Sequence, residues 1–126
     1  MLHVTILMVG KTREAFIQEG LAFYQKRLQP FLHLTLKSVR EEKEAAGLTA
    51  AAVKMREGQR LQAQIPPRAF VAALTPQGRE FTSEEFAAWL TRLELESRPL
   101  TFLIGGHLGL DEPTLAAASE RLASCP

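Results

Sequence analysis

The sequence predicts an α/β fold with a mainly parallel sheet and helices on both of its faces. Four short apolar segments alternate along the chain with four segments that have helical spacing or helix caps. This alternation is typical of βαβ units, in which each helix crosses over the sheet between two parallel strands. The 126 residues, of which 46% are hydrophobic and 23% charged, suffice for one core. We therefore expect a single domain over residues 1–126.

The four predicted strands differ in their pattern of apolar residues. Residues 2–9 are almost wholly apolar, as expected of a strand that is buried on both faces. Residues 31–39 alternate apolar and polar side chains, which favours a strand at the edge of the sheet. The two shorter apolar segments, residues 70–74 and 100–104, complete the predicted sheet.

Four helices are predicted between and after these strands. They begin at Arg13, Thr49, Thr82 and Asp111 and end near Leu28, Ile65, Leu93 and Leu122. Thr49 and Asp111 have side chains that cap helix N-termini, and Thr82 forms a capping box with Glu85. In the first helix, the amphipathic pattern places Phe16 on the apolar stripe.

Ligands of parallel α/β folds bind outside the carboxyl ends of the strands. Here these ends are residues 10–12, 74–78 and 105–109. Any functional site is therefore expected among these three turns.

The first of these turns, Gly10-Lys11-Thr12, resembles the end of a phosphate-binding P-loop. Thr5 stands where that motif needs its first glycine, which argues against a nucleoside triphosphatase. Two interpretations of Lys11 and Arg13 stay open. They are either solvent-facing residues of a strand-to-helix turn or contacts to the phosphates of RNA.

The third turn, Gly105-Gly106-His107-Leu108-Gly109, does not match the dinucleotide-binding pattern. Adjacent glycines after a buried strand allow a ligand to approach the backbone closely, or allow a positive φ. A tight turn without a ligand explains them equally well. His107 is either a base or a polar loop residue.

Charge and cysteine content exclude several classes of protein. The net charge is +1, divided into 10 Lys and Arg against 6 Glu in residues 1–63 and 5 Arg against 8 acids afterwards. The basic half is too weakly charged for a strongly basic nucleic-acid footprint. Cys125 is the single cysteine and the three histidines lack zinc-ligand spacing, so we expect no disulfide and no metal. With no membrane-spanning run and no signal peptide recognised, we expect a cytosolic protein.

Five segments fall in an order that resembles a known family. They are Ile6–Lys11, Tyr24–Leu28, Arg56–Leu61, Val71–Gly78 and Phe102–Leu110. Together they are similar to the RlmH family of large-subunit ribosomal RNA methyltransferases in the SPOUT superfamily. The resemblance covers the chain from Met1 to about Leu122.

The resemblance implies a SPOUT-type fold and a specific reaction. Members transfer a methyl group from S-adenosylmethionine to N3 of a pseudouridine in 23S ribosomal RNA, as cytoplasmic homodimers that act on the assembled ribosome. The family positions that contact the methyl donor correspond to Leu74 and Gly105. If Lys11 and Arg13 contact RNA, their place in the first turn and helix puts them away from Leu74 and Gly105.

The resemblance also implies a departure from the family pattern. The family continues with a strand, a Leu-Pro-His or Phe-Pro-His loop and a final helix, which together form a trefoil knot. This sequence ends at Pro126, so we expect a domain that is incomplete at its C-terminus and lacks the knot-forming segment. No residue is an obvious base for the reaction. Two alternatives stay open: a non-catalytic RNA- or ribosome-binding module of the same fold, and a nucleotide-binding domain unrelated to methylation.

Overall fold

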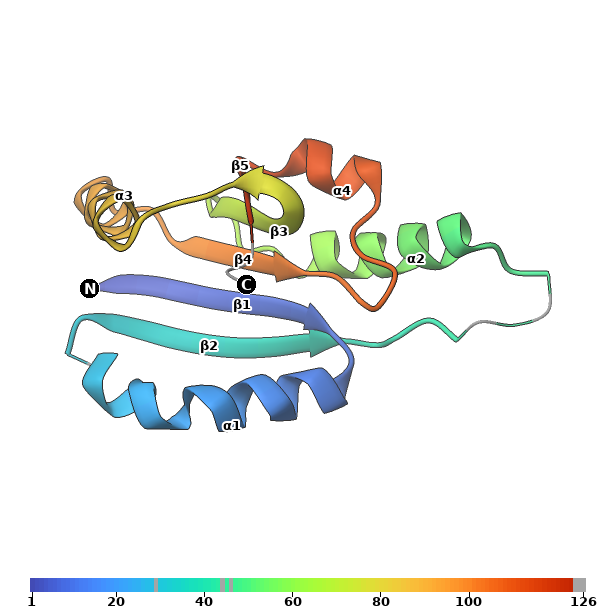
Figure 1. Ribbon diagram of the computed structural model, residues 1–126, viewed down its shortest axis with the longest axis horizontal. Coiled ribbons are helices and arrows are strands. Elements are labelled where there is room, and N and C mark those ends of the chain that lie inside the picture. Colours follow the sequence, from blue (N-terminus) through green and yellow to red (C-terminus); the bar gives the residue numbers. More distant parts are fainter. Residues whose placement is uncertain (29, 44, 46, 124–126) are drawn as a thin grey trace.

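A computed structural model describes residues 1–28, 30–43, 45 and 47–123 (Figure 1). Its centre is a five-stranded sheet in the order β2-β1-β4-β3-β5, in which each neighbouring pair is parallel. The strands are β1 (Leu2–Val9), β2 (Leu32–Val39), β3 (Phe70–Arg79), β4 (Leu100–Ile104) and β5 (Glu120–Leu122). The predicted parallel sheet is confirmed, with β2 at one edge.

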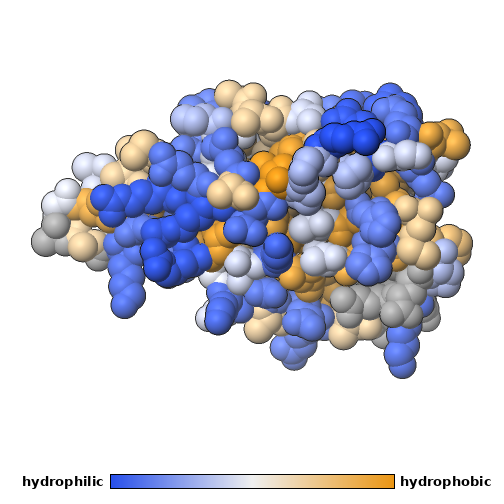
Figure 2. Space-filling view, turned by 180° about the vertical axis from the view of Figure 1, so that it is seen from behind, coloured by the Kyte–Doolittle hydropathy of each residue, from blue (hydrophilic) through white to orange (hydrophobic). Residues whose placement is uncertain are grey.

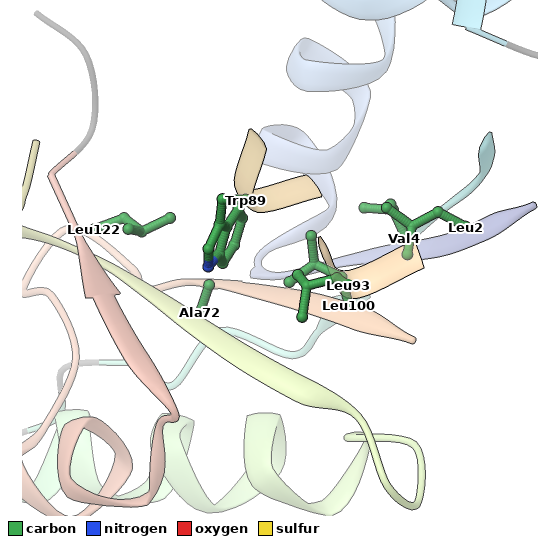
Figure 3. Packing of buried hydrophobic residues seen from close by; sticks show 7 residues of the cluster. All are labelled: Leu2, Val4, Ala72, Trp89, Leu93, Leu100 and Leu122. Atoms are coloured by element: carbon green, nitrogen blue, oxygen red, sulfur yellow. The ribbon is translucent and has the colours of Figure 1, made fainter. Parts of the chain in front are cut away.

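Helices cover both faces of the sheet, as predicted. They are α1 (Lys11–Leu28), α2 (Ala50–Ala63), α3 (Ser83–Leu95) and α4 (Glu112–Ala117). One face carries α1 and α3, and the other carries α2 and α4 (Figures 1 and 3). The predicted caps are confirmed, since Thr49, Thr82 and Asp111 accept hydrogen bonds from the backbone of the first turn of α2, α3 and α4.

The alternation of side chains along β1 supplies one core on each face. Leu2 and Val4 belong to one buried cluster with Trp89 and Leu93 of α3, and Figure 3 shows the members of this cluster. Further along β1, Leu7 and Val9 face α2 on the opposite side of the sheet and belong to a second buried cluster. The other members of that cluster are Leu61, Val71 and Leu103. A strand buried on both faces is what the almost wholly apolar residues 2–9 predict.

The predicted last helix is wrong in its second half. The helix α4 ends at Ala117, and Glu120–Leu122 form the fifth strand instead. The cause is the free edge of β3: the Ser119 N–H donates to the Val71 carbonyl at 2.8 Å, and the Val71 N–H donates to the Ser119 hydroxyl at 3.1 Å. The edge of β3 therefore captures the chain as a strand.

The predicted turn at residues 75–78 is also a strand in the structure. These residues belong to β3, which curls beyond the four residues that pair with β4. Because of this curl, Leu122 of β5 pairs with both Leu74 and Arg79. The expectations about Cys125 and about a missing knot segment lie outside the described residues and stay predictions.

The apolar stripe predicted for α1 is wrong at Phe16, whose side chain is 76% exposed. The half-buried positions at the start of the helix are Arg13, Glu14 and Ile17. Both polar groups have partners on or next to the sheet, since the Ser38 hydroxyl of β2 donates to Glu14 and Arg13 donates to the Gly105 carbonyl just after β4. Polar contacts thus orient α1 and leave Phe16 outside.

Gly78 is expected to be essential for the close packing of β5 against β3. A Cβ at this position would lie 2.3 Å from the carbonyl carbon of Leu122 and 2.6 Å from its nitrogen, and neither backbone atom can move alone. Overpacking of this kind costs about 1–3 kcal/mol, so Gly78→Ala should lower the midpoint of urea unfolding.

Gly20→Ala is the matched control, because nothing lies within 4 Å of an added Cβ there. In the exposed helix this change should stabilise the protein by up to ~1 kcal/mol. Equal midpoints for the two variants would contradict the expectation.

Candidate functional site

The carboxyl ends of the strands meet at one edge of the sheet, as the pairing register shows. Val9 pairs with Val39, and Met8 pairs with Ile104, so β1, β2 and β4 end nearly level. On the other side of β4, Ala73 pairs with Leu103. One position further along, this register leads to Leu74 and Ile104, so Leu74 lies next to Gly105 where β4 ends, although β3 itself continues to Arg79.

The turn after β4 folds back tightly on itself. The Gly109 N–H donates to the Gly106 carbonyl at 2.9 Å, and Gly109 has a φ of +86°. A Cβ on Gly105 would lie 2.6 Å from the carbonyl carbon of Gly109, so the turn requires glycine at position 105 with or without a ligand. Both interpretations of the paired glycines therefore include a structural requirement.

Glu57 of α2 lies behind this turn and is 2% exposed. One of its carboxylate oxygens accepts a hydrogen bond from the Glu42 N–H at 3.1 Å. The other oxygen would lie 2.9 Å from a Cβ on Gly106. Sequence reasoning assigned Glu57 no role, although its spacing of four residues from the buried Val53 and Leu61 places it on the inward face of α2.

A groove of about 1050 Å³ opens at the carboxyl edge beside β1, β2 and β4. Its described lining includes the cations Lys11, Arg13, Arg40 and Lys43, one carboxylate, Glu41, and several apolar residues. Seen from behind, this end of the molecule carries many strongly hydrophilic side chains (Figure 2, left). His107 also lines the groove, whereas Leu74 and Gly105 do not.

Arg13 connects the groove to the glycine turn. Its side chain lines the groove, and its guanidinium donates a hydrogen bond to the Gly105 carbonyl. The expectation that Lys11 and Arg13 both lie away from Gly105 is therefore wrong for Arg13. The reason is the parallel pairing of β1 with β4, which brings the first turn of α1 against the turn that follows β4.

The segment that follows β2 is fastened to α2. Arg60 donates to the Arg40 carbonyl at 3.1 Å and also pairs with the Glu42 carboxylate, which lies 3.4 Å from Arg56. The hydrogen bond from Arg60 holds the pKa of Glu42 below its ordinary value of 4.5, and the positive charges of Arg60 and Arg56 act in the same direction. Stability linked to this lowered pKa is present above pH 4.5 and is lost as the pH falls through the folded value. Glu42 is therefore paired rather than simply solvated.

Neither a metal centre nor a membrane span is found in the described chain. Among residues 1–28, 30–43, 45 and 47–123, no group of three or more His, Cys, Asp or Glu side chains is placed to hold a metal ion. The same residues form no helix that is both long and apolar enough to cross a membrane.

A glycine turn and a groove at the carboxyl edge of a parallel sheet are placed where α/β proteins bind their ligands. Residues 2–124 match the model of a family described as predicted SPOUT methyltransferase. The chain belongs to this family of methyltransferases, which confirms the resemblance inferred from the sequence motifs.

Individual relatives support the same assignment. The ribosomal RNA large subunit methyltransferase H of Carboxydothermus hydrogenoformans is 39% identical over 126 residues, which cover 97% of this chain and 79% of the relative. The protein of the same name from Desulfitobacterium hafniense is 41% identical over 114 residues, which cover 87% of this chain and 71% of the relative. A putative ribosomal RNA large subunit methyltransferase H from Methanoregula boonei is 39% identical over 129 residues, covering 99% and 81%.

Proposed function

We propose that the protein transfers a methyl group from S-adenosylmethionine to N3 of a pseudouridine in 23S ribosomal RNA of the assembled ribosome. The family match supports the methyl transfer, and the names of the relatives support an RNA substrate of the large ribosomal subunit. The observation that carries the proposal is the arrangement of the carboxyl edge. A glycine turn beside Leu74 and a basic groove adjoin there, and Arg13 touches both.

The residues at the β3–β4 edge fit the chemistry of the methyl donor. S-adenosylmethionine, when bound, supplies an electrophilic methyl group on a sulfonium. Leu74 is half-buried, so part of its apolar side chain is available to pack against an adenine or ribose. The turn at Gly105 supplies backbone polar groups, and the Gly105 carbonyl among them already accepts the hydrogen bond from Arg13. We assign Leu74 and Gly105 to the donor site.

The acceptor must lose a proton from N3 as the methyl group arrives, which requires a base or a stabilised anion. The catalytic base stays unassigned. Positioning accounts for a large part of such a reaction, about 7–11 kcal/mol in favourable cases. The contribution that the described residues can make is to hold the RNA, and we assign Lys11 and Arg13 to contacts with its phosphates. A cytoplasmic homodimer is part of the same proposal.

A methyl-transfer assay tests the proposed function. Radiolabelled S-adenosylmethionine is incubated with the protein and with ribosomes that lack the modification, and the nucleosides are then analysed by mass spectrometry. We expect a methylated pseudouridine on assembled ribosomes and none on protein-free RNA. Calorimetry with S-adenosylmethionine is run in parallel. Donor binding without methyl transfer would favour a non-catalytic RNA-binding module, and absence of donor binding would overturn the proposal.

A further inference from the structure

We propose that the groove at the carboxyl edge binds an unpaired RNA segment, with one base stacked on the ring of Phe16 and the phosphates held by Lys11, Arg40 and Lys43. The proposal rests on the proposed function for the nature of the substrate. It adds a place for the nucleotides that accompany the reacting one, and it gives Phe16, Arg40 and Lys43 a role in RNA binding that sequence reasoning did not.

The charge of the groove favours a polyanion. Its described lining has four cations and a single carboxylate. Lys11, Arg40 and Lys43 form no ion pair with another side chain in the described part of the protein. Cations that lie together without acidic partners attract phosphates, and their binding releases counterions from the nucleic acid.

The backbone that follows β2 is anchored as far as residue 42 before any ligand arrives. The Gly10 N–H donates to the Val39 carbonyl at 2.9 Å, which joins the end of β2 to the start of α1. The next residues are fastened by the bond from Arg60 to the Arg40 carbonyl and by the bond from the Glu42 N–H to Glu57. Because the backbone from residue 39 to 42 is anchored, binding costs less ordering of this segment.

The exposed ring of Phe16 indicates that the groove binds unpaired RNA rather than a duplex. It lines the groove and is 76% exposed, on a helix whose neighbouring positions Arg13 and Ile17 are half-buried against the sheet. Bases inside a duplex are stacked on one another and offer no face to a protein side chain, whereas an unpaired base can stack on an aromatic ring. A ring bordered by cations is the arrangement with which proteins bind single strands.

Fluorescence anisotropy with short labelled RNA tests the proposal. The full chain is titrated with an eight-nucleotide single strand, an abasic strand of equal length and charge, and a duplex of that length. We expect Phe16→Ala to weaken binding of the single strand about 5- to 100-fold, with little effect on the abasic strand or the duplex. Phe16→Trp should restore the affinity. The matched control is Phe31→Ala, because Phe31 is 68% exposed but lies at the start of β2, at the opposite end of the sheet.

The salt dependence tests the cations separately. Lys11→Ala, Arg40→Ala and Lys43→Ala should each reduce the slope of log affinity against log salt by about 0.7, whereas Arg92→Ala on α3 should not. Equal weakening by Phe31→Ala, or loss of affinity for the abasic strand in Phe16→Ala, would overturn the stacking. So would a Phe16→Ala protein that binds RNA normally but sediments as a different oligomer, since the ring would then contact a second copy. Base stacking on Phe16 without methyl transfer would support RNA binding by the groove and refute the proposed function.

Discussion

Gly105→Ala is expected to reduce donor affinity and methyl transfer at least ~100-fold while the sheet stays folded, because displacements of about 1 Å at a reacting centre have effects of that size. The added Cβ would lie 2.6 Å from the carbonyl carbon of Gly109, 2.8 Å from its oxygen and 2.9 Å from the nitrogen of Leu110. All three are backbone atoms of a turn that is closed by its own hydrogen bond and by the positive φ of Gly109. The turn must therefore open, and its backbone groups leave the edge beside Leu74.

Gly106→Ala is the matched control for this effect. The Cβ added there meets an oxygen of Glu57 at 2.9 Å, which is the end of a side chain rather than a backbone atom. We expect a much smaller loss of donor affinity, measured by calorimetry for both variants. Urea unfolding of each variant separates a local change in the turn from loss of the fold. If Gly105→Ala binds the donor normally, the donor does not bind at this turn.

Much of the fold is predictable because its determinants are local. A capping box such as Thr82 with Glu85 needs only residues three positions apart, and both of its hydrogen bonds form as expected. The almost wholly apolar sequence of β1 likewise indicates a central strand without knowledge of its neighbours. These elements are correct because nothing distant competes with the local preference.

The predictions that are wrong concern residues whose conformation or burial depends on a partner far away in the sequence. Residues 120–122 have no strand pattern of their own and become β5 because the edge of β3 is open to them. Phe16 has helical spacing that suits burial, yet Arg13 and Glu14 occupy the side of α1 that faces the sheet. A pattern within one helix does not reveal which of its rows has polar partners elsewhere.

The candidate site was predictable in part for the same reason. The rule for parallel sheets located the carboxyl ends, and Lys11, Arg13 and His107 do line the groove found there. Arg40 and Lys43 were missed because they follow an edge strand within a run of charges. Only the pairing of Val9 with Val39 places them opposite Lys11.

Arg13 is expected to couple RNA binding to donor binding, which gives it a larger effect than any other cation of the groove. Its guanidinium has five N–H donors, so a phosphate can bind the others while the hydrogen bond to the Gly105 carbonyl persists. RNA and S-adenosylmethionine should then strengthen each other's binding to the unaltered protein, each raising the affinity for the other by the same factor of about 5-fold or more. Donor affinity is measured by calorimetry with and without the single-stranded RNA.

Arg13→Ala should lower donor affinity about 10-fold even without RNA, because a charge-assisted hydrogen bond to the turn is lost. It should also reduce the salt slope of RNA binding by about 0.7 and abolish the mutual strengthening. Lys11→Ala is the matched control, since Lys11 lines the same groove but forms no hydrogen bond to the turn in the described structure. It should change the salt slope alone.

Arg13→Lys keeps the charge but not the forked geometry, so it should restore the salt slope and leave donor binding weak. An Arg13→Ala protein with normal donor affinity would show that the carbonyl of Gly105 holds its place without this bond, and that the groove and the donor site act independently.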